Sequence, residues 1–271
     1  MKQLIVPTDF SDGAWNALLY ATDIGEKLGI REILVLNSYE AHHAGAATWV
    51  SIDKIMQKDS EKGLDKWMDK IKKTGISSRF NFHRKSIHSG LVEAINSQID
   101  DYNDKLVVMG SLGETGMVEK IFGSNASDVA LKANCPVIMV PSEARFLNCK
   151  NVVLGSDYDQ VAPRNLQIMR TICAFDPTTK LQIVHVQDED EAPSSKASMG
   201  LDQDDIPHSI KVISGDDVSE ALDEYVTNSD TDLLVLIKKD SGFFDKFFHR
   251  SITKKLTLLG HTPLLILKRI D

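Results

Sequence analysis

Short apolar runs alternate with amphipathic stretches along this chain. The runs at 4–6, 33–36 and 106–109 are continuous, which is typical of strands buried on both faces of a sheet. Between the first two runs, apolar residues recur at helical spacing after Ser11, a good N-cap, and before Gly29, where a C′ glycine belongs. These residues are Ala14, Ala17, Leu18, Ala21, Ile24 and Leu28. Strands that alternate with helices predict a parallel sheet covered on both faces.

A second amphipathic helix is predicted after the second run. Its apolar face holds Ile52, Ile55, Met56, Leu64, Trp67, Met68 and Ile71. Because parallel strands are joined by right-handed crossovers, the whole pattern favours a doubly wound α/β unit of five strands. Such units bind ligands in the crevice at the carboxyl ends of their strands.

The chain contains this unit twice. Residues 4–10 resemble residues 152–158, an offset of 148 positions. Further along, residues 106–109 correspond to residues 233–236, where the offset has fallen to 127. The second copy is therefore shorter by 148 − 127 = 21 residues. An internal repeat of this size indicates a duplicated domain.

Each copy closes with a proline and an apolar strand, at residues 136–140 and 263–267. We therefore predict two domains, at residues 1–143 and 149–271. A chain of 271 residues is long enough for two such domains.

A glycine-rich loop follows the apolar run at 106–109. It reads Gly110, two residues, Gly113, nine residues, then Gly123 and Ser124, which open a helical pattern. Glycines let backbone N–H groups approach an anion, and a helix N-terminus favours negative charge. Taken alone, Gly110 and Gly113 are more simply interpreted as turn glycines after a strand. The additional spacing to Gly123 and Ser124 favours a phosphate site instead.

Three predicted strands of the first copy end on residues that suit a ligand site. Asp9 follows the first strand, Ser38 the second and Gly110 the fourth. Because the carboxyl ends of parallel strands share one edge, we expect these residues to meet in one crevice. Asp9 could instead cap the following helix, although Ser11 already suits that role.

These residues resemble the universal stress protein family in its tandem form, over nearly the whole chain. The resemblance implies two Rossmann-like domains, similar to adenine nucleotide alpha hydrolases, whose closing strands pair edge to edge as an internal pseudo-dimer. The family's nucleotide-binding members carry the same spacing of Gly110, Gly113, Gly123 and Ser124. The resemblance therefore implies bound ATP, with Mg²⁺ as its companion.

The resemblance also implies a role for each site residue. Asp9 would lie at the ribose and adenine end, Ser38 beside the adenine, and Met109 and Gly110 along the ribose; Gly113, Gly123 and Ser124 would contact phosphates. Where the family often continues with Val-Thr, this chain has Asn125 and Ala126, and Asn125 could supply an amide donor in place of the missing hydroxyl.

The second copy departs from this pattern. Ile237, Asp240 and Arg250 stand where the first copy has its three glycines. Two bulky side chains and a carboxylate would keep a phosphate from the backbone, so we predict that the second copy binds no nucleotide. His185, inside a predicted strand of this copy, is interpreted as a structural histidine rather than a base.

Composition narrows the remaining functions. The net charge of −8 argues against nucleic acid as a partner, and no apolar run is long enough to span a membrane. Three cysteines without metal-ligand spacing indicate free thiols in the cytoplasm, and no metal site is predicted.

We expect an ATP-binding regulatory protein of the stress response, acting on an unknown protein partner, rather than an enzyme. A slow ATPase or a self-phosphorylating protein is an alternative, with Ser124 or Ser127 as acceptor, and so is a scaffold without ligand. The absence of a P-loop lysine argues against fast phosphoryl transfer. Further pairing into a homodimer stays open. The acidic stretch 188–205 is either a solvated linker or a contact for a partner. The aromatic cluster 243–248 either belongs to the core or forms a contact for a partner.

Overall fold

The computed structural model describes residues 1–40, 49–111, 123–146, 149–156, 161–187, 201, 206–238 and 261–268. Several positions singled out above lie outside them. They are Gly113, Asp240, Arg250, Asp157 (the counterpart of Asp9 in the second copy), the aromatic cluster 243–248, and all of the acidic stretch 188–205 except Leu201.

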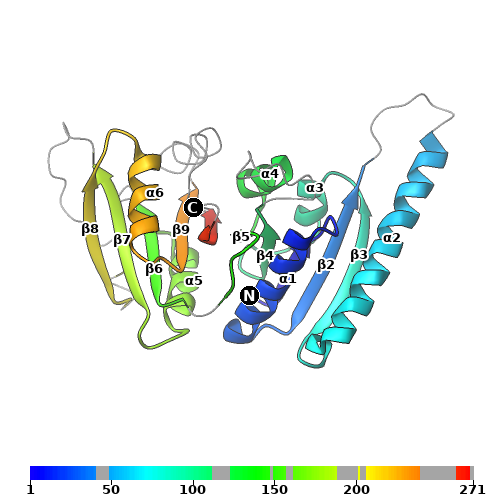
Figure 1. The fold of residues 1–271 in the computed structure, drawn as a ribbon, viewed down its shortest axis with the longest axis horizontal. Helices are drawn as coiled ribbons and strands as arrows, with labels where there is room; N and C mark the ends of the chain where they lie inside the picture. The colour runs from blue at the N-terminus through cyan, green and yellow to red at the C-terminus, as the bar shows by residue number, and fades with distance from the viewer. Residues whose placement is uncertain are drawn as a thin grey trace.

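Strands and helices alternate through both halves of the chain (Figure 1). The first half contains β1 (Gln3–Pro7), α1 (Asp12–Leu28), β2 (Glu32–Tyr39), α2 (Trp49–Thr74), a 3₁₀ turn (Ile76–Ser78), β3 (Asn81–His88), α3 (Leu91–Asn96), β4 (Lys105–Gly110), α4 (Ser124–Lys132) and β5 (Val137–Val140). The second half contains β6 (Asn151–Ser156), α5 (Pro163–Cys173), β7 (Lys180–Gln187), β8 (His208–Ser214), α6 (Val218–Asn228), β9 (Leu233–Lys238) and β10 (Leu264–Lys268).

The strands form one ten-stranded sheet in the order β3-β2-β1-β4-β5-β10-β9-β6-β7-β8. Pairing is parallel within each half, and the two halves meet where β5 pairs antiparallel with β10, with Ile138 opposite Leu265. The expected pair of doubly wound five-stranded units, joined edge to edge through their closing strands, is thus confirmed. Each half covers an edge of the other that would otherwise lie open.

Helices cover both faces of the sheet. Leu4 and Val6 point to a core shared with α1, α2 and α5, whereas Ile5 points to a core shared with α3, α4 and α6. All three side chains are fully buried. This two-sided burial explains why the strands read as continuous apolar runs.

The ends of α1 follow the sequence expectation. Ser11 Oγ accepts a hydrogen bond from Ala14 N at 3.1 Å, and Gly29 adopts φ 68° at the helix end. The N–H of Gly29 donates to Glu26 O at 3.3 Å. A left-handed residue there satisfies carbonyls of the last turn.

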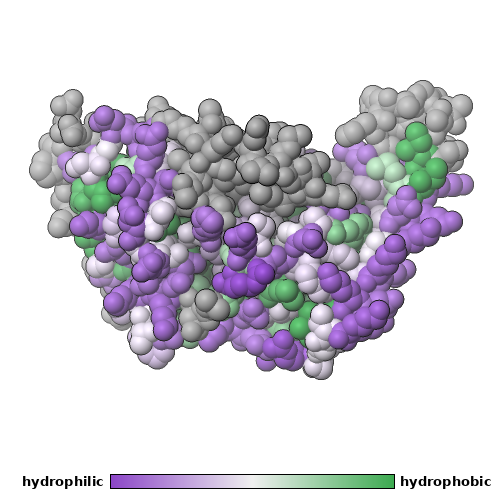
Figure 2. All heavy atoms as spheres, in the orientation of Figure 1, coloured by the Kyte–Doolittle hydropathy of each residue, from purple (hydrophilic) through white to green (hydrophobic). Residues whose placement is uncertain are grey.

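The predicted face of α2 is only partly correct. Leu64, Trp67 and Ile71 are buried, but Ile55 is 59% exposed. Figure 1 shows the reason, because the amino-terminal part of α2 runs past the ends of β2 and β3. In Figure 2 the outer side of α2 is mainly hydrophilic, with a hydrophobic group near that projecting end. Helical spacing reveals an apolar stripe, but not how far the sheet beneath it extends.

A buried polar network joins the halves beside β5 and β10. The hydroxyl of Tyr102 accepts from Lys268 N at 2.6 Å and donates to Asn165 Oδ1 at 3.3 Å. Asn165 Nδ2 in turn donates to Lys268 O at 3.2 Å. Burial raises the pKa of Tyr102, which therefore stays a neutral donor.

Candidate functional site

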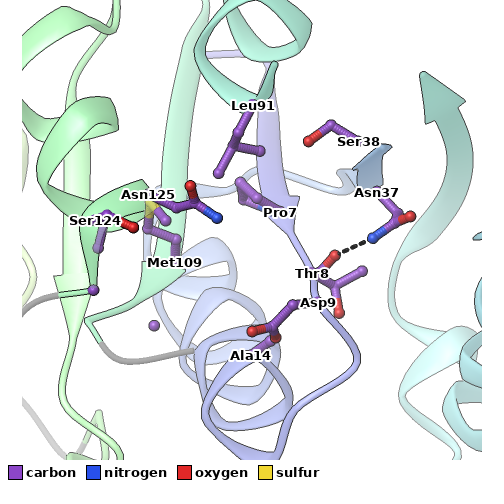
Figure 3. Close-up of a pocket in the computed structure, with 13 residues that line it drawn as sticks. Pro7, Thr8, Asp9, Ala14, Asn37, Ser38, Leu91, Met109, Ser124 and Asn125 are labelled. Carbon is purple, nitrogen blue, oxygen red and sulfur yellow. Dashed lines mark hydrogen bonds between the residues drawn. The ribbon is translucent and has the colours of Figure 1, made fainter. Parts of the chain in front are cut away.

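A cavity of about 380 Å³ opens at the carboxyl ends of β1, β2 and β4 (Figure 3). Its volume lies within the roughly 300–1,000 Å³ typical of small-molecule sites. The lining residues are Pro7, Thr8, Asp9, Ala14, Asn37, Ser38, Leu91, Met109, Gly110, Gly123, Ser124, Asn125 and Ala126.

Seven of the eight predicted site residues line this one cavity, and the eighth, Gly113, lies outside the described residues. The seven are Asp9, Ser38, Met109, Gly110, Gly123, Ser124 and Asn125. Figure 3 shows Ser124 and Asn125 across the cavity from Asn37 and Ser38. The crevice predicted from the strand ends is therefore present, while the role of each residue stays a prediction.

Sequence reasoning missed the side chain that joins two of these strands. Asn37 is buried at the end of an apolar run, and its Nδ2 donates to Thr8 O at 2.6 Å. Thr8 N donates to Leu36 O at 2.8 Å. The N–H of Thr8 thus binds the backbone of β2, and its carbonyl binds the Asn37 side chain. A lone amide among apolar residues was the available signal, since a buried amide needs a partner.

The turn after β1 places Asp9 at the mouth of the cavity. Thr8 Oγ1 accepts from Phe10 N at 2.8 Å, and Asp9 Oδ1 accepts from Ser11 N at 3.1 Å. Phe10 has φ 68°, a left-handed conformation. The carboxylate of Asp9 thus supports its own turn while Ser11 caps α1, and it is the one ionisable side chain among the described lining residues.

The amino terminus of α4 forms the opposite wall. Gly123 is its N-cap, with φ −66° and ψ 156°, and Gly123 O accepts from Ser127 N at 3.0 Å. The first hydrogen bond inside α4 is the one from Ser127 N, so the N–H groups of Ser124, Asn125 and Ala126 have no partner within the helix and can bind an anion. The helix dipole strengthens the attraction for negative charge at this end.

The glycine loop is anchored at both described ends. Gly123 N donates to Ser111 O at 3.0 Å, and Ser111 N donates to Val140 O at 2.9 Å. Ser111 is buried directly after β4. These bonds hold the first turn of α4 beside Gly110, which brings the two ends of the glycine motif to the same cavity.

The second half repeats the frame of this site. His185 Nδ1 donates to Ser156 O at 2.8 Å, as Asn37 does to Thr8, and both residues lie at the predicted offset. This bond to the neighbouring strand is what a structural histidine would make, and the role of His185 stays a prediction. Ile237, half-buried at the end of β9, stands where the first half has Gly110.

Two further features bear on possible ligands. Among the described residues, no group of three or more His, Cys, Asp or Glu side chains is arranged to hold a metal ion. Within the same residues, no helix combines the length and apolarity that crossing a membrane requires.

Known proteins resemble the chain in both sequence and fold. A universal stress protein of Methanocaldococcus jannaschii is 24% identical over 147 residues, which is 51% of this chain and 81% of that protein. The structure of a universal stress protein from Archaeoglobus fulgidus is 18% identical, with a TM-score of 0.72 over 99% of this chain and 97% of its own. A Pseudomonas aeruginosa structure described as a putative universal stress protein is 11% identical, with a TM-score of 0.54 over 99% and 93%.

The family match rests on the half that contains the cavity. The sequence model described as the universal stress protein family matches residues 1–141, which end just after β5. That range includes every residue that lines the cavity. The chain is therefore a member of the universal stress protein family.

Proposed function

We propose that the first half of this chain binds ATP, with Mg²⁺ as its companion, and that the protein acts as an ATP-binding regulator of a stress response. The observation that carries the proposal is the convergence of seven predicted residues on one cavity. Five of them come from motif spacing and strand ends, whereas Met109 and Asn125 come from the family resemblance. The second half would act as a structural partner without nucleotide.

Backbone groups would hold the phosphates. Gly123 leaves room for close approach, and the N–H groups of Ser124 and Asn125 face an anion at the start of α4. No lysine or arginine stands among the described lining residues, so these amides supply the donors there. Asp9 and Ser38, on the far side from α4, would face the ribose and the base.

The same lining favours binding over chemistry. Fast phosphoryl transfer requires a cation on the transferred group and a side chain that orients the nucleophile. Among the described lining residues, Asp9 is the one acidic residue and none is cationic. ATP would then act as a ligand that changes the protein's affinity for a partner, rather than as a substrate.

Calorimetric titration of nucleotide-free protein with Mg·ATP tests the proposal. We expect one site per chain. A Gly123→Val variant should weaken binding because its side chain would stand between the phosphates and the amides of α4. Thr74→Val, remote from the cavity at the end of α2, is the matched control. Absence of heat and of competition with a fluorescent ATP analogue would contradict the proposal.

The nucleotide recovered after long incubation separates regulator from enzyme. Intact ATP supports binding alone. Stoichiometric ADP, or a phosphate on Ser124 or Ser127, would instead support the slow ATPase or the self-phosphorylating protein.

A further inference from the structure

Phe10 adopts a backbone conformation that aromatic residues rarely take. Its φ of 68° lies in the left-handed region, where a bulky side chain is an outlier. It stands between Asp9, which lines the cavity, and Ser11, which caps α1. Strain at such a position persists only where surrounding contacts hold it.

The contacts that hold Phe10 come from α2. Its ring packs edge-on against Trp67, with centroids 6.1 Å apart and planes at 74°. The same ring lies over Gly63, where an added Cβ would be 2.4 Å from Phe10 Cζ. Trp67 packs in turn against Trp15 of α1, with centroids 5.3 Å apart. Gly63 therefore provides the space in the surface of α2 that the ring occupies.

The ring is linked to the cavity through the backbone. Phe10 N donates to Thr8 Oγ1 at 2.8 Å, and the next amide, Ser11 N, donates to Asp9 Oδ1 at 3.1 Å. Thr8 and Asp9 both line the cavity, whereas no described lining residue belongs to α2. Phe10 therefore gives α2 a direct connection to two residues of the cavity wall, Thr8 and Asp9.

We propose that Phe10 is a positioning residue for this site, and that its ring, seated on Gly63, couples the position of α2 to ligand affinity. The inference rests on the proposed function, since ATP is the ligand whose affinity would change. Coupling is reciprocal, so ATP binding also changes the contact between Phe10 and α2.

Four proteins test the coupling: wild type, Gly63→Ala, Phe10→Gly and the double variant. The methyl group that Gly63→Ala adds would press against the ring, and we expect ATP binding to weaken about tenfold, which corresponds to about 1.4 kcal/mol. Phe10→Gly permits the left-handed turn but removes the ring, so binding should weaken about threefold to tenfold. In the double variant the added methyl group meets no ring, so its affinity should equal that of Phe10→Gly. This non-additivity is the signature of a direct contact.

Two controls separate positioning from general damage. Lys66→Ala changes an exposed residue of the same helix and should leave ATP affinity unchanged. Urea unfolding should show that Gly63→Ala keeps most of its stability, because alanine has a higher helix propensity than glycine and so offsets part of the cost of the contact with the ring.

Tryptophan emission provides a second readout. In a Trp49→Phe background the remaining tryptophans are Trp15 and Trp67, which contact each other beside Phe10. We expect ATP to change their emission, and the change to disappear in Phe10→Gly.

The possible failures are distinguishable. A wild-type protein that binds no ATP would overturn the proposed function and this inference with it. A wild type that binds ATP, together with a Gly63→Ala variant whose affinity lies within twofold, would overturn the coupling alone. Unchanged tryptophan emission on saturation with ATP would also count against it.

Discussion

The two halves of the molecule share a frame and differ in the residues that fill it. In each half the first strand pairs with the second in the same register, Val6 with Val35 and Leu154 with Ile183. A side chain of the second strand binds the carbonyl at the end of the first in both halves, although it is Asn37 in one and His185 in the other. Gly110, at the end of β4, has no glycine counterpart in the second half, where Ile237 stands at the corresponding position of β9. The sheet therefore depends on apolar strands and one polar cross-link, whereas the site depends on a few small residues that the fold itself does not need.

The largest effect is expected when the first half receives the residue that the second half has at the end of β9, in a Gly110→Ile variant. Gly110→Ile should lower ATP affinity about 100-fold or more, which is about 2.8 kcal/mol, because its side chain would fill the cavity wall. Isoleucine suits a strand, so urea unfolding should change little. Calorimetry and urea titration measure the two quantities on the same protein. The reciprocal Ile237→Gly should gain no ATP site, and a second site there would contradict our account of the second half.

The polar cross-link can be tested by exchange. Asn37→Ala leaves the carbonyl of Thr8 without its buried donor and should cost about 1–3 kcal/mol of unfolding free energy. Asn37→His copies the second half and should recover most of that loss, while its larger ring in the cavity wall weakens ATP binding. Equal stability of the two variants would show that the hydrogen bond contributes nothing.

Buried thiols make both halves sensitive to alkaline pH. Burial raises the pKa of Cys135 in the first half to about 12 and that of Cys149 in the second to about 12. The unfolded chain loses these protons near pH 9, so each thiol's contribution is complete below that pH and is lost as pH rises toward 12. Each should lower the unfolding free energy by at most about 1.4 kcal/mol per pH unit across that window.

Cys135→Ala and Cys149→Ala should each flatten the fall of stability measured by urea unfolding between pH 7 and pH 10.5. Burial also raises the pKa of Tyr20 and Tyr102, so each variant is compared with wild type at the same pH. A slope unchanged in both variants would mean that neither thiol is buried in solution.

The smallest expected effect concerns the first helix of each half. Ser11 caps α1 with its hydroxyl, whereas α5 begins after Ala162 with Pro163 in its first turn. Ser11→Ala should cost about 1 kcal/mol and Ala162→Ser should gain about 0.5–1 kcal/mol, both measured by thermal or urea unfolding. A loss of stability in Ala162→Ser would show that the second half lacks space for a capping hydroxyl.

Sequence reasoning located the elements whose pattern depends on local periodicity. The caps of α1 and the apolar strands of both halves follow from spacing alone, and the repeat predicted the pairing of β5 with β10 once the family resemblance was recognised. The edge strand β3 offered no such signal, because Asn81–His88 is mostly polar and largely exposed. An edge strand is held by its neighbour rather than by its own apolar residues.

The residues of the candidate site that follow from a motif or a strand end were predicted from the sequence. Those that reach the cavity through tertiary packing were not. Gly110, Gly123 and Ser124 belong to a motif with fixed spacing, and Asp9 and Ser38 follow from strand ends. Leu91 enters from α3, far along the chain, and no local pattern assigns it to the cavity. The left-handed turn at Phe10 was not predicted either, because the packing of its ring against α2 depends on residues far along the chain.

The antiparallel joint between β5 and β10 has a consequence for how such a protein diverges. In a dimer of identical chains every substitution appears at both sites, and the interface must match itself. Here residues 141–150 tether the two edges, which gives an effective concentration of the order of millimolar without any additional contact. Association no longer depends on symmetry. Each half can therefore carry different residues at the same position of the frame, as Gly110 and Ile237 do here, while the edges stay paired.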